Sequence, residues 1–131
     1  LVIAPKGGPV AGEIVAQRTY LTAASIELDA VVVASPAAPA ADAAPGLDQK
    51  AGAADPEAVD PRVVKVLQEM WRHSKAILAL EPAEAALAAA QVSGKGVESA
   101  ADGASAVSRL TELLPAHRVW ERFPTTGRLA D

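Results

Sequence analysis

Two uninterrupted apolar runs with a helical pattern between them constrain the fold of this chain more than any other feature. The runs are Ala30–Ala34 and Ala76–Leu80. Short continuous apolar runs are typical of strands that are covered on both faces, as the strands of parallel sheets are. The segment between the runs carries apolar residues at helical spacing, namely Val63, Val66, Leu67, Met70 and Trp71. Strand, helix and strand in this order predict an α/β fold with helices on both faces of a parallel sheet.

The ends of two helices are marked by residue type. Asp60 is a suitable N-cap and Pro61 is tolerated in a first turn, so a helix should begin there and run to about Lys75. Pro82 should open an Ala-rich helix that ends near Ser93.

Shorter signals fill the two ends of the chain. Residues 2–4, 13–16 and 19–21 are β-prone pieces that we expect to form a small excursion beside the main sheet. Residues 96–98 are a candidate short strand. A last helix is expected over about 102–114, with one apolar face made of Ala106, Val107, Leu110, Leu113 and Leu114.

The chain is predicted to be a single domain, 1–131, with one long loop. A chain of this length can build one core. The loop is the Ala/Pro-rich stretch 36–59, which has no periodicity. The first residues lack an initiator Met and look like the middle of a strand, so we expect the chain to be part of something longer.

Composition excludes several classes of function. A net charge of −4 with mixed signs along the chain argues against nucleic acid as a partner. No cysteine is present, which excludes disulfides, zinc ribbons and thiol nucleophiles and agrees with a reducing, cytoplasmic location. The longest apolar runs are far shorter than the roughly 20 residues of a membrane span, so no membrane is expected.

Four residues are candidates for catalysis or metal binding, and each has a simpler interpretation. Ser35 follows a predicted buried strand, but no nucleophile elbow surrounds it, and an ordinary loop serine is favoured. His73 lies in the last turn of a predicted helix, where a cation suits the helix dipole. His117 and Glu121 could share a helical face, yet two ligands make a weak metal site.

Two further segments resemble sites only in part. Glu81 and Glu84 follow the second predicted strand and could be paired carboxylates, although the first turn of a helix is the favoured interpretation. Gly94-Lys95-Gly96 lacks the flanking residues of a phosphate loop and is expected to be a turn. No catalytic, cofactor-binding or metal residue is therefore assigned.

Read in order, these segments resemble the C-terminal domain of large-subunit haem catalases. Residues 19–33, TYLTAASIELDAVVV, resemble the approach to the third strand of that domain. Residues 113–124, LLPAHRVWERFP, are similar to its terminal helix and exit, and 60–75 resemble the helix between them. The match covers nearly the whole chain, with its specific parts at the two ends.

The resemblance implies a flavodoxin-like three-layer fold, related to class I glutamine amidotransferases and the ThiJ/PfpI group. In that superfamily a Cys nucleophile follows the strand corresponding to Ala76–Leu80, where this chain has Glu81-Pro82 instead. The resemblance also implies that the family's domain begins with a strand and a helix before Leu1, so residues 2–4 and Ala30–Ala34 should be parallel strands that flank a vacant position in the sheet.

The parent implied by this resemblance is a homotetrameric haem catalase that converts hydrogen peroxide to water and oxygen. The haem belongs to the parent, and no cofactor is expected in this chain. Its partners would be the upstream catalase core and other subunits, and its role would be structural, with shaping of haem access or a chaperone-like role as additions. Two alternatives stay open: a free-standing ThiJ/PfpI-like hydrolase that uses Ser35 with a His, and a peptide-binding module with exposed aliphatic surface.

Overall fold

A computed structural model describes residues 1–34 and 59–122. Its centre is a parallel sheet of three strands in the order β5-β6-β7, made of Ala30–Val33, Ala76–Leu80 and Val97–Ala100. The two apolar runs therefore pair directly, with Val31 opposite Ile77. This confirms both predicted strands, and the predicted short strand is confirmed as β7.

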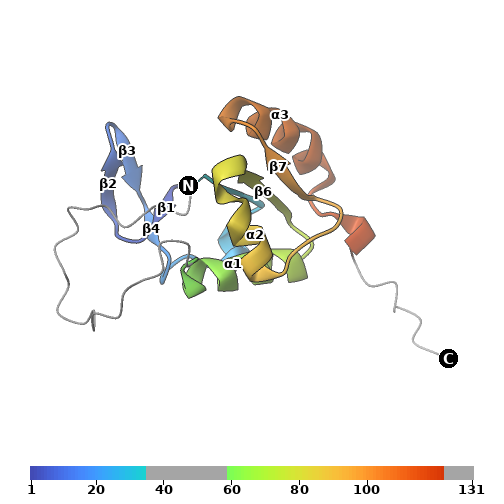
Figure 1. Cartoon of the computed structure of the whole chain (residues 1–131), viewed down its shortest axis with the longest axis horizontal. Helices are drawn as coiled ribbons and strands as arrows, with labels where there is room; N and C mark the ends of the chain where they lie inside the picture. The colour runs from blue at the N-terminus through green and yellow to red at the C-terminus, as the bar shows by residue number, and fades with distance from the viewer. Residues whose placement is uncertain (35–58, 123–131) are drawn as a thin grey trace.

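The central strand β6 is buried on both faces, because helices cover it from both sides. Helices α1 (Pro61–Arg72) and α2 (Glu84–Ala90) share a core cluster with Ile77, whereas α3 (Gly103–Leu113) shares a second cluster with Leu78. Successive strand residues point to opposite faces, so the two clusters lie on the two faces of the sheet. In Figure 1, α3 lies on the side of β6 and β7 away from α1.

Local capping explains where the helices begin. The Asp60 side chain accepts a hydrogen bond of 2.8 Å from the Arg62 amide, and Pro61 occupies the first turn. Asp102 caps α3 in the same way, through the Ser105 amide at 2.7 Å. The Ala-rich helix is preceded by a 3-10 turn, η2 (Glu81–Ala83), so its α-helical part starts later than Pro82 predicts.

The N-terminal region forms two small sheets of its own. Strand β1 (Ile3–Ala4) pairs in parallel with β4 (Arg18–Thr19), and β2 (Gly8–Ala11) pairs antiparallel with β3 (Ile14–Ala16). Figure 1 shows β2 and β3 projecting at the end of the molecule opposite α3. The predicted excursion beside the main sheet is confirmed. Strand β2 was not predicted, because the Gly-Gly-Pro stretch at its start is typical of the end of a strand.

Two expectations about packing were wrong, and one helix is shorter than predicted. Val107 and Leu114 are 63% and 41% exposed, because α3 meets the sheet through Ala106, Leu110 and Leu113. Trp71 is 42% exposed at the edge of α1 and donates its indole N–H to the carbonyl of Ser93. The first helix ends at Arg72, before the predicted end near Lys75, and the segment before β5 forms a 3-10 turn, η1 (Ser25–Glu27), which was not predicted. The loop 36–59 lies outside the described residues except for Val59.

Candidate functional site

The most distinctive feature of the surface is the free edge of β5. This strand is hydrogen-bonded to β6 on one side, and no strand among the described residues pairs with its other side. Val31 and Val33 pack against the cluster under α1. Val32 points to the opposite face and is 37% exposed, because α3 contacts β6 and β7 instead. We call this free side of Ala30–Val33 the β5 edge.

Strand β1 belongs to the same neighbourhood without joining the sheet. Ile3 packs against the cluster that contains Leu28 and adjoins Val31 and Val33. The backbone of β1 is nevertheless paired with β4. The expectation that the first apolar piece and Ala30–Ala34 are not direct neighbours is therefore confirmed, whereas a strand from outside between them stays a prediction.

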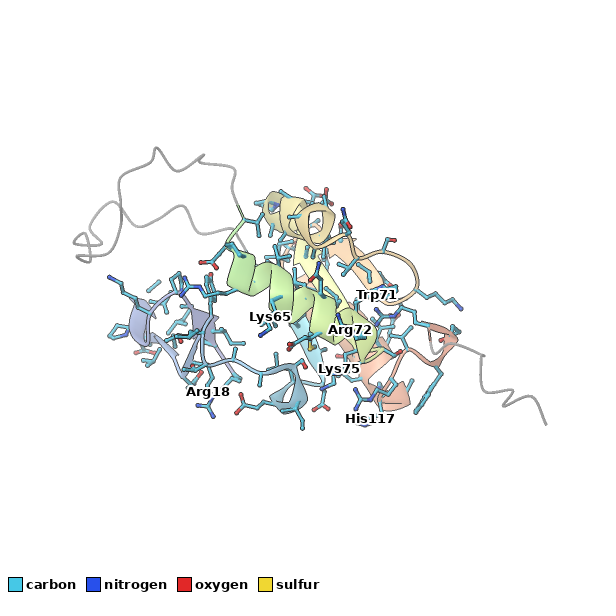
Figure 2. All side chains as sticks on the ribbon, turned by 90° about the horizontal axis from the view of Figure 1, so that it is seen from below. Arg18, Lys65, Trp71, Arg72, Lys75 and His117 are labelled. Carbon is cyan, nitrogen blue, oxygen red and sulfur yellow. The ribbon has the colours of Figure 1, made fainter. Side chains whose placement is uncertain are left out.

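A buried lysine holds the segment that leads into β5. Lys75 is 4% exposed, and its ammonium donates hydrogen bonds to the main-chain carbonyls of Ser25, at 2.5 Å, and of Leu28. Burial lowers the pKa of this amine, and the nearby Arg118 lowers it further, against an opposing effect of Asp29. Figure 2 shows Lys75 close to the end of α1 that carries Arg72. The start of β6 is thus tied to the start of β5.

The two predicted candidates Ser35 and His73 are not shown to meet. Ser35 lies outside the described residues. His73 is the C-cap of α1, and its Nδ1 lies 3.1 Å from the hydroxyl of Ser25. Serine beside histidine is the first requirement of a nucleophilic site, but Ser25 is only 4% exposed and no described carboxylate is hydrogen-bonded to His73. The contact joins η1 to α1.

Sequence reasoning missed both Ser25 and Lys75. Ser25 lies in the segment that leads into the first predicted strand and was given no role, and Lys75 was placed at the end of a helix. No local pattern marks either residue, because their partners are about 50 positions away in the chain.

The predicted pair His117 and Glu121 is separated in the structure. His117 ends a 3-10 turn with a φ of 62°, and its Nδ1 lies 3.9 Å from Asp29. Glu121 lies in the next turn and pairs with Lys95 at 3.1 Å. The two residues do not lie in one helix, so the prediction that they could share a helical face was wrong. Residues 1–34 and 59–122 contain no group of three or more acidic or His side chains that could hold a metal.

The remaining candidates take their simpler roles. Glu81 begins η2 and Glu84 begins α2, both exposed, as residues of a first turn. Gly94-Lys95-Gly96 forms the turn before β7, and both glycines have positive φ. Gly96 lies against Val119, so closely that a Cβ at Gly96 would be 2.3 Å from Val119 Cγ2.

The C-terminal end of the described chain is held by arginines. Arg118 donates to the carbonyl of His73 at 3.0 Å, and Arg122 donates to the carbonyl of Lys75. The Arg122 guanidinium lies 6.0 Å from the centre of the Trp71 ring, and burial lowers its pKa. Trp120 is 56% exposed on the surface of the domain, as expected for the exit segment, while Phe123 lies outside the described residues.

The family model of the C-terminal domain found in long catalases matches residues 1–124. No curated protein matches the chain. Among the helices of the described part, none is both long enough and apolar enough to cross a membrane.

Proposed function

The chain belongs to the family of C-terminal domains found in long catalases, and on that premise we propose that it is a non-catalytic, structural domain of a large-subunit haem catalase. The parent enzyme converts hydrogen peroxide to water and oxygen in its upstream core. The domain, 1–131, stabilises the assembled parent, which is a cytoplasmic homotetramer. Nucleic acid and membranes have no part in this role.

The observation that carries the proposal is the β5 edge. An unpaired edge of a largely apolar strand favours pairing with another strand. Ile3 of β1 and Val31 of β5 pack against one cluster, but their strands are not bonded to each other. A strand of the parent that lies between β1 and β5 would join the two parallel pairs into one sheet. A helix after that strand would cover Val32.

The residues of this chain do not fit a haem site. Catalases hold the haem iron through a tyrosinate. Tyr20 is the one tyrosine of the chain, and burial raises its pKa, with Asp60 adding to the rise and Arg62 opposing it. A raised pKa disfavours the tyrosinate. The Arg62 guanidinium also lies 5.7 Å from the centre of the Tyr20 ring, so that one of its faces is occupied. The haem chemistry is therefore left to the core.

The test is deletion of this domain from the full-length parent. We expect the truncated enzyme to keep its Soret band and its peroxide turnover per haem, and to lose activity faster on heating or in dilute solution. The domain expressed alone, residues 1–131, should show neither a Soret band nor peroxide turnover.

Three results would contradict the proposal. Loss of turnover in a truncated enzyme with an intact Soret band would give the domain a part in catalysis. Haem binding with catalase activity by residues 1–131 alone would place the chemistry in this chain. The stability proposal fails if the truncated and full-length enzymes are inactivated at the same rate.

A further inference from the structure

The β2–β3 hairpin stands apart from the rest of the fold. Strands Gly8–Ala11 and Ile14–Ala16 pair with each other, and neither strand has an extensive contact with a helix or with the central sheet. Figure 1 shows the hairpin projecting from the body of the molecule. A hairpin of two strands is marginally stable by itself in water and needs further strands or a packing surface.

Both faces of this hairpin carry exposed aliphatic side chains. Ile14 and Val15 are consecutive residues of β3, so their side chains point to opposite faces. Ile14 is 53% exposed and Val15 is 47% exposed, and Val10 on the facing strand is 51% exposed. A strand with one wet face would alternate apolar and polar residues, whereas apolar residues on both faces are typical of a strand enclosed on both sides.

The tip of the hairpin bears an acidic group. Gly12, with a φ of 53°, makes the turn, and the exposed Glu13 follows it. Glu13 makes no ion pair within the described residues. A carboxylate at the leading end argues against insertion into a membrane, whose cytoplasmic leaflet is negatively charged. It suits a protein groove with aliphatic walls and a Lys or Arg at its rim.

We propose that the β2–β3 hairpin is an arm that inserts into an aliphatic groove of the catalase core in the assembled parent. This inference rests on the proposed function and names the surface that performs it. The core is the occupant because it is tethered to the domain, which gives it a millimolar effective concentration of the order found for linked modules. A cation at the rim of the groove would pair with Glu13.

Single cysteines on the arm test this inference, since residues 1–131 contain no cysteine of their own. Ile14→Cys and Val15→Cys are introduced separately into the full-length parent and labelled with a maleimide under native conditions. Val107→Cys, on α3, is the matched control, because Val107 is a β-branched residue that is 63% exposed. Each variant is first checked for an unchanged Soret band and turnover.

We expect both arm cysteines to react at least about tenfold more slowly than the control, a factor that corresponds to about 1.4 kcal/mol. Ile14→Cys and Val15→Cys should both be protected, since the arm is enclosed on both faces. Labelling of either cysteine at the rate of Val107→Cys would contradict the proposal that the arm is enclosed on both faces. Protection that persists in domains separated from the core, and rises with their concentration, would make a second copy the occupant instead of the core.

Failure of the docking arm and failure of the proposed function give different results. If the parent has no Soret band or peroxide turnover, the catalase assignment fails whatever the labelling shows. If the parent is an active catalase and the arm cysteines label freely, only the docking arm is wrong. The charge argument has its own check: Glu13→Lys should raise the labelling rate of Val15→Cys by a larger factor in the full-length parent than in the domain separated from the core, where the new lysine acts only by lowering the pKa of the thiol.

Discussion

The ammonium group of Lys75 donates a hydrogen bond of 2.5 Å to the main-chain carbonyl of Ser25, a residue 50 positions earlier in the chain. A second bond, to the carbonyl of Leu28, uses the same ammonium. Lys75 immediately precedes β6, and Leu28 lies two residues before β5. These bonds therefore fix the approach to β5 against the central strand, and with it the position of the β5 edge.

Replacement of Lys75 with Met should destabilise the domain. The substitution keeps an unbranched side chain one atom shorter but leaves two main-chain carbonyls without their donor, and an unsatisfied buried polar group costs about 1–3 kcal/mol. The measurement is the urea concentration at which the domain of the full-length protein becomes sensitive to pulse proteolysis. Lys65→Met, at an exposed position of α1, is the control and should change this concentration little. Equal effects of the two substitutions would show that the buried bonds do not stabilise the fold.

Alkaline pH should widen the difference between the wild type and Lys75→Met. The pKa of Lys75 in the folded protein is below its ordinary value of 10.5, mainly because of burial. Between the lowered and the ordinary pKa, the unfolded chain binds more protons than the folded one, so the free energy of unfolding rises with pH in that window. The neutral amine still has two N–H donors for its two carbonyls. Urea titrations of both proteins from neutral pH to about 10.5 test this, and a difference that shrinks as pH rises would contradict it.

Gly96→Ala should destabilise the domain more than Gly94→Ala. Both glycines have positive φ, which costs an alanine about 1–2 kcal/mol. A Cβ at Gly94 would have no heavy atom within 4 Å, whereas at Gly96 it would be 2.3 Å from Val119 Cγ2. The difference between the two variants in urea midpoint therefore reports the contact with Val119. Similar midpoints would mean that residue 119 moves away at little cost.

Ser35→Ala should leave the hydrolysis of generic esters and amides at the uncatalysed rate, as in the unmodified chain. His73, one proposed partner of Ser35, is within hydrogen-bond distance of Ser25. Ser25→Ala is the matched control, because Ser25 is the serine that does adjoin a histidine. Hydrolysis by the unmodified chain that disappears with Ser35→Ala alone would support the hydrolase alternative.

Trp120→Ala should loosen docking of the domain more than its folding. Trp120 is 56% exposed, so truncation removes little buried surface inside the domain, while exposed Trp residues are frequent anchors of protein interfaces. Dissociation of the assembled parent on dilution should increase, with an unchanged urea midpoint of the domain. A lower midpoint with unchanged dissociation would assign Trp120 to the fold.

Local sequence preferences predicted some residues correctly and others wrongly. The predictions for His73, Glu81 and Glu84 as ordinary helix-end residues agree with their places in the structure, because capping and first-turn preferences are local. The exposure of Val107 and Trp71 could not be predicted. Helical spacing shows which side of a helix is apolar, but not how much of that side the rest of the fold covers.

The sequence by itself determined that Ala30–Val33 and Ala76–Leu80 are strands and that a capped helix lies between them. Continuous apolar runs and the pair Asp60-Pro61 act through neighbours in the chain, so the local sequence is enough to predict the two strands and the start of the helix. Only the tertiary structure decided that Lys75 would be buried under two carbonyls. Such a bond depends on groups about 50 residues apart, which meet only after the sheet has formed and excluded water from between them.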